Sequence, residues 1–188
     1  MRRTLAMAVI SSLLTVAVSC EKSAQPPASN AVTGNWNFVS VNVQSETIAV
    51  QNGDTSISYP NYITQQNSGT IDFTVDSMAV KGLGYAVDTS FYTYFYMNGV
   101  VVDTVSSPLI GSIPPTSMGI PYKMVNTDSL YIANAGIFFP AGAGSANQGL
   151  GANFVVSGDT LRITSHINDT ASAEITIGKA VITLVKQH

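Results

Sequence analysis

Few residues in this chain are of types that do chemistry, and the most informative is its single cysteine, Cys20. A cysteine sulfur is a nucleophile and can carry a covalent group. The only histidines are His166 and His188, and a lone histidine on a strand is usually structural. No serine-hydrolase elbow, paired glutamates, metal-binding histidine pair or phosphate-binding glycine loop occurs. The sequence therefore predicts a protein that is not an enzyme, with no cofactor and no metal site.

The segment before Cys20 has the organisation of a secretory signal. Arg2 and Arg3 give a positively charged start, and residues 5–18 are uncharged and mostly apolar. This run is shorter than the roughly 20 residues that a membrane-spanning helix needs. Small residues, Ala17 and Ser19, lie where a signal peptidase cuts. We therefore expect residues 1–19 to be a signal peptide that is removed.

Two cleavage reactions fit this segment, and they differ in the fate of Cys20. An ordinary signal peptidase accepts these small residues, and Cys20 is then incidental. The stretch 16–20 (Val-Ala-Val-Ser-Cys) also resembles a lipobox, in which the sulfur takes a diacylglyceryl group and the mature chain keeps fatty acyl chains such as palmitate. Two chains hold a protein on a membrane where one binds only marginally. Because the one cysteine stands where lipidation needs it, we favour lipid attachment at Cys20.

Charge and cysteine content limit the partners. Loss of Arg2 and Arg3 with the signal leaves six Lys and Arg against eleven Asp and Glu. Such an acidic chain is not expected to bind nucleic acid, which needs a basic face. With one cysteine there is no disulfide within the chain. Glu21, rather than aspartate, follows the lipid cysteine, which favours the outer membrane, on either its periplasmic or its surface side.

The mature chain divides into a tether and one domain. Residues 20–33 comprise the lipidated cysteine and a polar, proline-containing segment without periodicity, which predicts a flexible tether. Residues 34–188 are of a suitable length for a single domain.

This domain is predicted to be all-β. Val, Ile, Thr, Phe and Tyr dominate it, good helix formers are scarce, and no stretch has the apolar spacing of an amphipathic helix. The expected strands are 35–43, 46–50, 69–76, 77–87, 89–97, 100–106, 120–126, 129–139, 152–157, 160–167 and 173–186. Long loops are expected at 106–121, which holds four prolines, and at 140–152.

Local signals place several strand ends. Asn98-Gly99 predicts a two-residue type I′ turn, which pairs Met97 with Val100 and Phe95 with Val102. The Phe, Met and Val face of this hairpin is the better candidate for a dry core, and its tyrosine face for a wetter surface or a cavity mouth. An Asp-Ser/Thr-apolar pattern recurs at Asp76, Asp128 and Asp159, and predicts three strands that each begin after a turn.

The two ends of the domain resemble bacterial lipocalin-like lipoproteins. The residues that carry this are Gly34-Asn35-Trp36 after a lipoprotein tether, and the closing segments 158–163 and 180–186. The resemblance implies an up-and-down antiparallel β-barrel, and a β-sandwich is the alternative fold. It also implies that Trp36 packs at the closed end against an arginine, and the mature chain has only Arg162. The other interpretation is that Trp36 is an ordinary core aromatic.

Aromatic side chains are the best candidates for a ligand site. These candidates are Trp36, Tyr92, Tyr94, Tyr96, Tyr131 and Phe154. Ordinary core and surface packing is the rival explanation for them. A hydrolase stays as a minor alternative, which would need His166 beside a serine or threonine nucleophile in a cleft. Two functions are favoured over it. One is a lipid-anchored envelope protein whose barrel binds a small apolar ligand, and the other is an envelope or surface interaction protein without such a ligand, which uses the apolar segment 106–121.

Overall fold

In the computed structural model, which describes residues 30–139, 149–171 and 174–188, the chain forms one antiparallel sheet. The predicted signal peptide, Cys20 and the tether up to residue 29 lie outside the described residues. The elements are η1 (Asn30–Val32), β1 (Gly34–Gln51), β2 (Asp54–Ser58), β3 (Tyr62–Ile63), β4 (Gln65–Phe73), β5 (Ser77–Met97), β6 (Val100–Met124), β7 (Ser129–Ile132), η2 (Ala135–Phe138), β8 (Leu150–Ser157), β9 (Thr160–Ala171) and β10 (Glu174–Lys186). None of the described helices has the length and apolar character needed to cross a membrane.

The strands close into a ring of eight. From β5 to β10 each strand pairs with the next in the chain, and β10 pairs with β1 over nearly its whole length. The ring is completed by β2, β3 and β4, which follow one another along β1 as a single interrupted strand, and both β2 and β4 also pair with β5. The prediction of an all-β antiparallel fold is confirmed. The sheet is barrel-like, and the sandwich description fits it as well.

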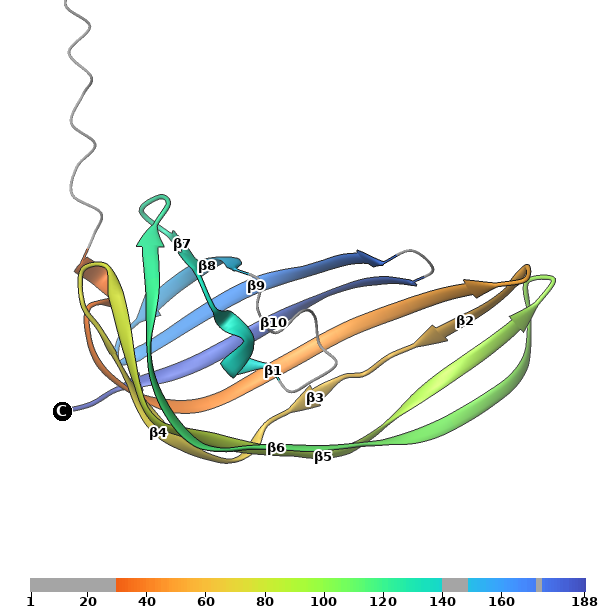
Figure 1. The fold of residues 1–188 in the computed structure, drawn as a ribbon, viewed down its shortest axis with the longest axis horizontal. Coiled ribbons are helices and arrows are strands. Elements are labelled where there is room, and N and C mark those ends of the chain that lie inside the picture. Colours follow the sequence, from red (N-terminus) through yellow and green to blue (C-terminus); the bar gives the residue numbers. More distant parts are fainter. Residues whose placement is uncertain (1–29, 140–148, 172–173) are drawn as a thin grey trace, which may run out of the picture.

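As far as the described strands show, the ring is complete at one end of the molecule. There β4, β7 and β8 fill the space between the long strands, and η1 and the C terminus lie beside them (Figure 1). Toward the other end β6 loses its second neighbour, since it pairs with β7 only at Tyr122–Met124, and β9 pairs with β8 only up to Ser165. The β1–β2 and β5–β6 hairpins continue past this point and end together far from η1 (Figure 1). We call the closed part the proximal ring.

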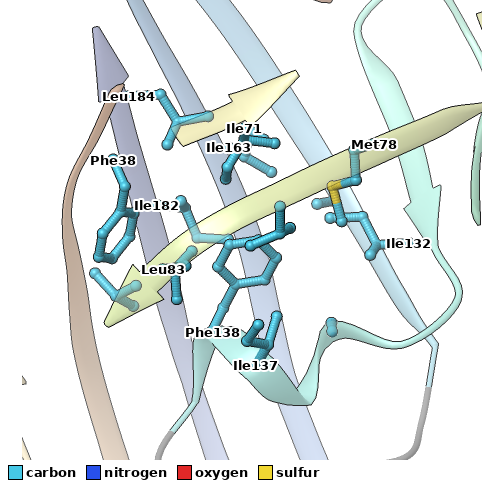
Figure 2. Packing of buried hydrophobic residues seen from close by; sticks show 14 of the residues in the cluster. Phe38, Ile71, Met78, Leu83, Ile132, Ile137, Phe138, Ile163, Ile182 and Leu184 are labelled. Carbon is cyan, nitrogen blue, oxygen red and sulfur yellow. The ribbon is translucent and has the colours of Figure 1, made fainter. Parts of the chain in front are cut away.

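Apolar side chains from all eight strands of the ring fill its interior. On β10, Ala180, Ile182 and Leu184 are buried and alternate with more exposed residues, as the pleat of a strand requires. Phe138, on η2, is also fully buried and lies among the sheet residues (Figure 2). Burial of this kind contributes about 25 cal/mol per Å² of apolar surface, so the proximal ring supplies most of the stability of the fold.

Trp36 belongs to this core and not to a cation–π pair. Its side chain is 1% exposed, and its Nε1–H donates a hydrogen bond to the Val32 carbonyl oxygen of η1 at 2.8 Å. Arg162 is exposed on β9, between the buried residues Leu161 and Ile163, so it faces away from the interior. The expected contact of Trp36 with Arg162 is therefore wrong. The interpretation of Trp36 as a core aromatic is the one that fits its burial.

Several predicted strands are parts of longer ones. Segments 35–43 and 46–50 are both in β1, and segments 77–87 and 89–97 are both in β5. The expected loop 106–121 is wrong, because these residues pair with β5 as part of β6. Proline is tolerated there because β6 is an edge strand over this range, and an edge residue can lack an N–H without breaking a ladder on both sides. Only the start of the predicted strand 129–139 is extended, as β7, and its end forms η2.

Turn chemistry was the more accurate guide to strand starts. Strands β5, β7 and β9 begin at Ser77, Ser129 and Thr160, each the residue directly after the aspartate of the recurring pattern. The predicted loop 140–152 falls largely outside the described residues, and its last three residues already belong to β8.

Candidate functional site

The far end of the molecule is a hairpin built by local sequence. Asn98 and Gly99 both have positive φ, 52° and 77°, as a type I′ turn needs, and Met97 pairs with Val100 as predicted. Beyond the next pair the register shifts by one, so that Phe95 faces Asp103 and not Val102. This register shift is a β-bulge, and Val102 is its extra residue. A two-residue turn fixes the register next to it but does not reveal a bulge two pairs further on.

We call residues 46–58 and 88–110, the far halves of β1, β2, β5 and β6, the distal arm. No residue of it is in the buried core. The expectation that one face of the hairpin packs in a dry core is wrong, because the arm extends beyond the reach of the proximal ring. Seven of the fourteen residues from Tyr92 to Val105 are large, apolar and exposed, namely Tyr92, Phe95, Met97, Val100, Val101, Val102 and Val105.

The arm also offers a free sheet edge. Strand β6 pairs with β5 from Val100 to Pro121, and along this stretch no other described strand pairs with its outer side. Natural proteins usually protect such an edge with proline, lysine or a β-bulge. Prolines occur at 108, 114, 115 and 121, but residues 100–107 contain none, and no lysine. The bulge at Val102 is the one irregularity in this stretch, and the edge that follows it, from Asp103 to Ser107, is open to pairing.

The charges of the arm are all of one sign. Glu46, Asp54, Asp88 and Asp103 lie in it, and no Lys or Arg does. Among the described residues the one ion pair joins His188 to Asp159, outside the arm, so the four carboxylates have no cationic partner there. The Asp103 carboxylate accepts a hydrogen bond from the Thr104 backbone N–H at 2.8 Å, which holds it close to the edge of β6.

A shallow hollow of about 310 Å³ lies beside the tip of the arm. It opens between the β1–β2 turn and the β5–β6 hairpin, and its lining mixes apolar and polar side chains: Asn52, Asp54, Phe95, Tyr96, Met97 and Val102. The apolar members would accept a small apolar side chain, and Asp54 adds a negative charge at its rim.

The aromatic candidates from the sequence are not brought into one site. Trp36 and Phe154 are buried in the proximal ring, and Tyr131 lies on its outside with the Lys123 ammonium 5.5 Å from its ring centroid. The remaining three are in the arm. Tyr92 is exposed, Tyr94 is half-buried in an edge-to-face contact with Tyr59, and Tyr96 lines the hollow at the tip.

Two other tyrosines, which the sequence did not single out, carry unpartnered groups inside the ring. Tyr62 and Tyr85 are 7% and 3% exposed, and neither phenol oxygen has a hydrogen-bond partner among the described residues. Burial raises the pKa of both phenols, and the nearby Tyr62 raises the pKa of Tyr85 further. A buried hydroxyl without a partner costs about 1–3 kcal/mol, so these positions need an explanation. No local pattern marks them, because their burial depends on long-range packing.

The structure also tests whether His166 lies beside a nucleophile. His166, Ser129 and Thr164 line one hollow of about 250 Å³ between β7, β8 and β9. The Ser129 hydroxyl is buried but makes no hydrogen bond to any described residue, so it is not bonded to the imidazole as an activated serine would be. Among the described residues no three His, Cys, Asp or Glu side chains gather as metal ligands.

Comparison with known proteins gives no relative from which a function could be taken. No family model matches the chain, and no curated protein or solved structure is detectably similar to it.

Proposed function

We propose that this chain is a lipid-anchored protein of the bacterial cell envelope, attached through Cys20 to the outer membrane, and that it binds another envelope or surface protein through the distal arm. The observation that carries this proposal is the run of exposed apolar residues from Tyr92 to Val105. Monomeric soluble proteins rarely leave so many large apolar side chains of one hairpin in contact with water unless a partner covers them. We propose no catalytic role and no cofactor.

The direction of the arm supports this role. The described chain begins at η1, beside the proximal ring, and β1 runs from there to the tip of the arm (Figure 1). An 18-residue strand spans roughly 60 Å when extended. A membrane anchor upstream of η1 would therefore hold the proximal ring and leave the arm free to reach a partner.

Site-specific photo-cross-linking in living cells tests the interaction. A photoreactive amino acid replaces Tyr92 in the arm or, as a control, Val155 on β8 of the proximal ring, which is at least as exposed. We expect a discrete protein adduct from position 92 and none from position 155. No adduct at 92, or the same adducts at both positions, would refute the proposed function.

Metabolic labelling with a clickable palmitate tests the anchor independently. Wild-type chain should incorporate the label and remain with the membrane fraction, and Cys20→Ala should lose the label. Equal labelling of both, or release of the wild type into the medium, would exclude lipid attachment at Cys20.

A second candidate function, binding of a small apolar or amphipathic ligand beside Tyr62 and Tyr85, is favoured by their unpartnered phenols. A ligand with a hydrogen-bond acceptor would satisfy these hydroxyls, and Tyr62 lines a hollow of about 380 Å³ together with Asn42 and Gln65. A fluorescent fatty acid is a suitable probe. Saturable binding that falls at least tenfold in Tyr62→Phe/Tyr85→Phe would support this candidate, and binding that the double variant does not change would exclude it.

A further inference from the structure

The chemistry of the arm points to one kind of occupant. We propose that the partner contributes an extended, positively charged segment, which adds as a new strand along residues 100–107 of β6. This inference rests on the proposed function, since it names the partner's chemistry at the same surface.

The backbone of β6 provides the first argument. Among the described strands, residues 100–107 pair only with β5, and they contain no proline. An edge strand with unpaired N–H and C=O groups recruits an extended segment through main-chain hydrogen bonds, and alternate side chains then give the specificity. No described strand pairs with the β9 edge beyond Ser165 either, but no large apolar residue described on that stretch is exposed.

Apolar contact provides the second argument. Val101 and Val105 on this stretch are 45% and 42% exposed, and neighbouring Phe95 and Met97 on β5 are exposed as well. An added strand beside β6 would cover Val101 and Val105 from the edge.

Charge distinguishes a basic segment from two other possible occupants of this edge, a second copy of the chain and an anionic lipid surface. With four carboxylates and no Lys or Arg, the arm attracts cations, and the Asp103 carboxylate is fixed at the edge itself. A second copy of this chain that paired edge to edge would bring two acidic arms together, and like charges facing across strands are destabilising. An anionic lipid surface would also be repelled. A segment in which Lys or Arg alternates with apolar residues fits both the charge and the apolar surface.

The test uses three labelled ten-residue peptides and the full chain in detergent. In the first peptide lysine alternates with valine, in the second glutamate replaces lysine, and in the third two prolines replace central valines. Fluorescence anisotropy should show binding of the first peptide, at least tenfold weaker binding of the other two, and weaker binding at 0.5 M salt, where charges are screened. Equal binding of the lysine and glutamate peptides, or of the proline peptide, would overturn the inference.

Variants and hydrogen exchange locate the bound peptide. Asp54→Asn/Asp103→Asn should weaken binding of the lysine peptide by about three- to tenfold, as expected for exposed charge pairs. The matched control Asp128→Asn, an exposed aspartate outside the arm, should not change it. The peptide should slow amide exchange at residues 100–107 and leave 166–171 unchanged. Protection only at 166–171, or an unchanged affinity in the double variant, would overturn the inference.

The remaining outcomes separate this inference from the proposed function. If the lysine peptide fails to bind but position 92 still yields its adduct, the inference fails and the proposed function stands. If position 92 yields no adduct, both fail. A dimer of the chain in analytical ultracentrifugation, together with slowed amide exchange at residues 100–107 in that dimer, would identify a second copy as the occupant. That result would overturn the inference.

Discussion

The same strands behave differently in the proximal ring and in the distal arm. On β5 the residues Met78, Val80, Leu83, Tyr85 and Val87 are all buried, and from Asp88 onward none is. The composition of the strand does not change at that point, since aromatic and β-branched residues continue to the tip. High β-propensity keeps the arm extended, but only the ring has opposing walls to pack against. The comparison indicates that the ring provides stability and that the arm is available for binding.

The largest predicted difference between the two regions is in truncation of an aromatic side chain. Trp36→Ala removes a fully buried ring and its hydrogen bond to Val32, and should lower the free energy of unfolding by about 3–5 kcal/mol. Tyr92→Ala in the arm should cost less than about 1 kcal/mol. Urea denaturation of both variants measures this. Equal losses would mean that the arm is part of the cooperative core.

Glycine-to-alanine substitutions should also destabilise the ring more than the arm, with a smaller difference between the two regions. Gly69 has φ +101°, and an added Cβ would lie 2.5 Å from the Leu83 backbone, so Gly69→Ala requires both strain and backbone movement. Gly99 has φ +77° with open space around it, so Gly99→Ala meets only the strain. We expect Gly69→Ala to lower the free energy of unfolding by about 3 kcal/mol or more, and Gly99→Ala to lower it by about 1 kcal/mol. Thermal unfolding of each variant checks the order, and a reversed order would contradict the packing of β4 on β5.

Alkaline pH should weaken the ring through its buried tyrosines. An unfolded tyrosine titrates near pH 10. Because burial raises the folded pKa of Tyr62 and Tyr85, only the unfolded chain releases these protons just above pH 10. The free energy of unfolding should therefore hold its value below pH 10 and fall as the pH rises further. Urea titrations from pH 9 to 11 should show a smaller fall in Tyr62→Phe/Tyr85→Phe, and an identical fall would exclude these two phenols as its cause.

The smallest predicted effect is at an exposed valine of the arm. Val101→Thr preserves β-propensity and replaces one exposed methyl group with a hydroxyl, so it should change the free energy of unfolding by less than about 0.5 kcal/mol. The matched change Val156→Thr on β8 of the ring, also exposed, should be equally mild. A loss above 1 kcal/mol from Val101→Thr alone would show that the arm contributes to the core after all.

Much of the fold could be predicted from local sequence. Alternation and β-branched residues gave the all-β class, the aspartates at 76, 128 and 159 gave the strand starts, and Asn98-Gly99 gave the hairpin turn. The site could not be predicted in the same way. Alternation of Phe and Tyr in residues 91–97 is the same whether or not a second wall covers it, so the pattern alone predicts burial for a face that is exposed. The prolines in 106–121 predict a loop because the sequence does not show that β6 lacks a second neighbour there.

The most direct test of this division between ring and arm combines stability and binding in one variant. Val101→Thr/Val105→Thr is made in the chain that carries the photoreactive group at position 92, and both the adduct and the free energy of unfolding are measured. Our account predicts that the adduct falls at least tenfold while the free energy of unfolding changes by less than about 1 kcal/mol. A wild-type yield of the adduct in this stable variant would contradict it.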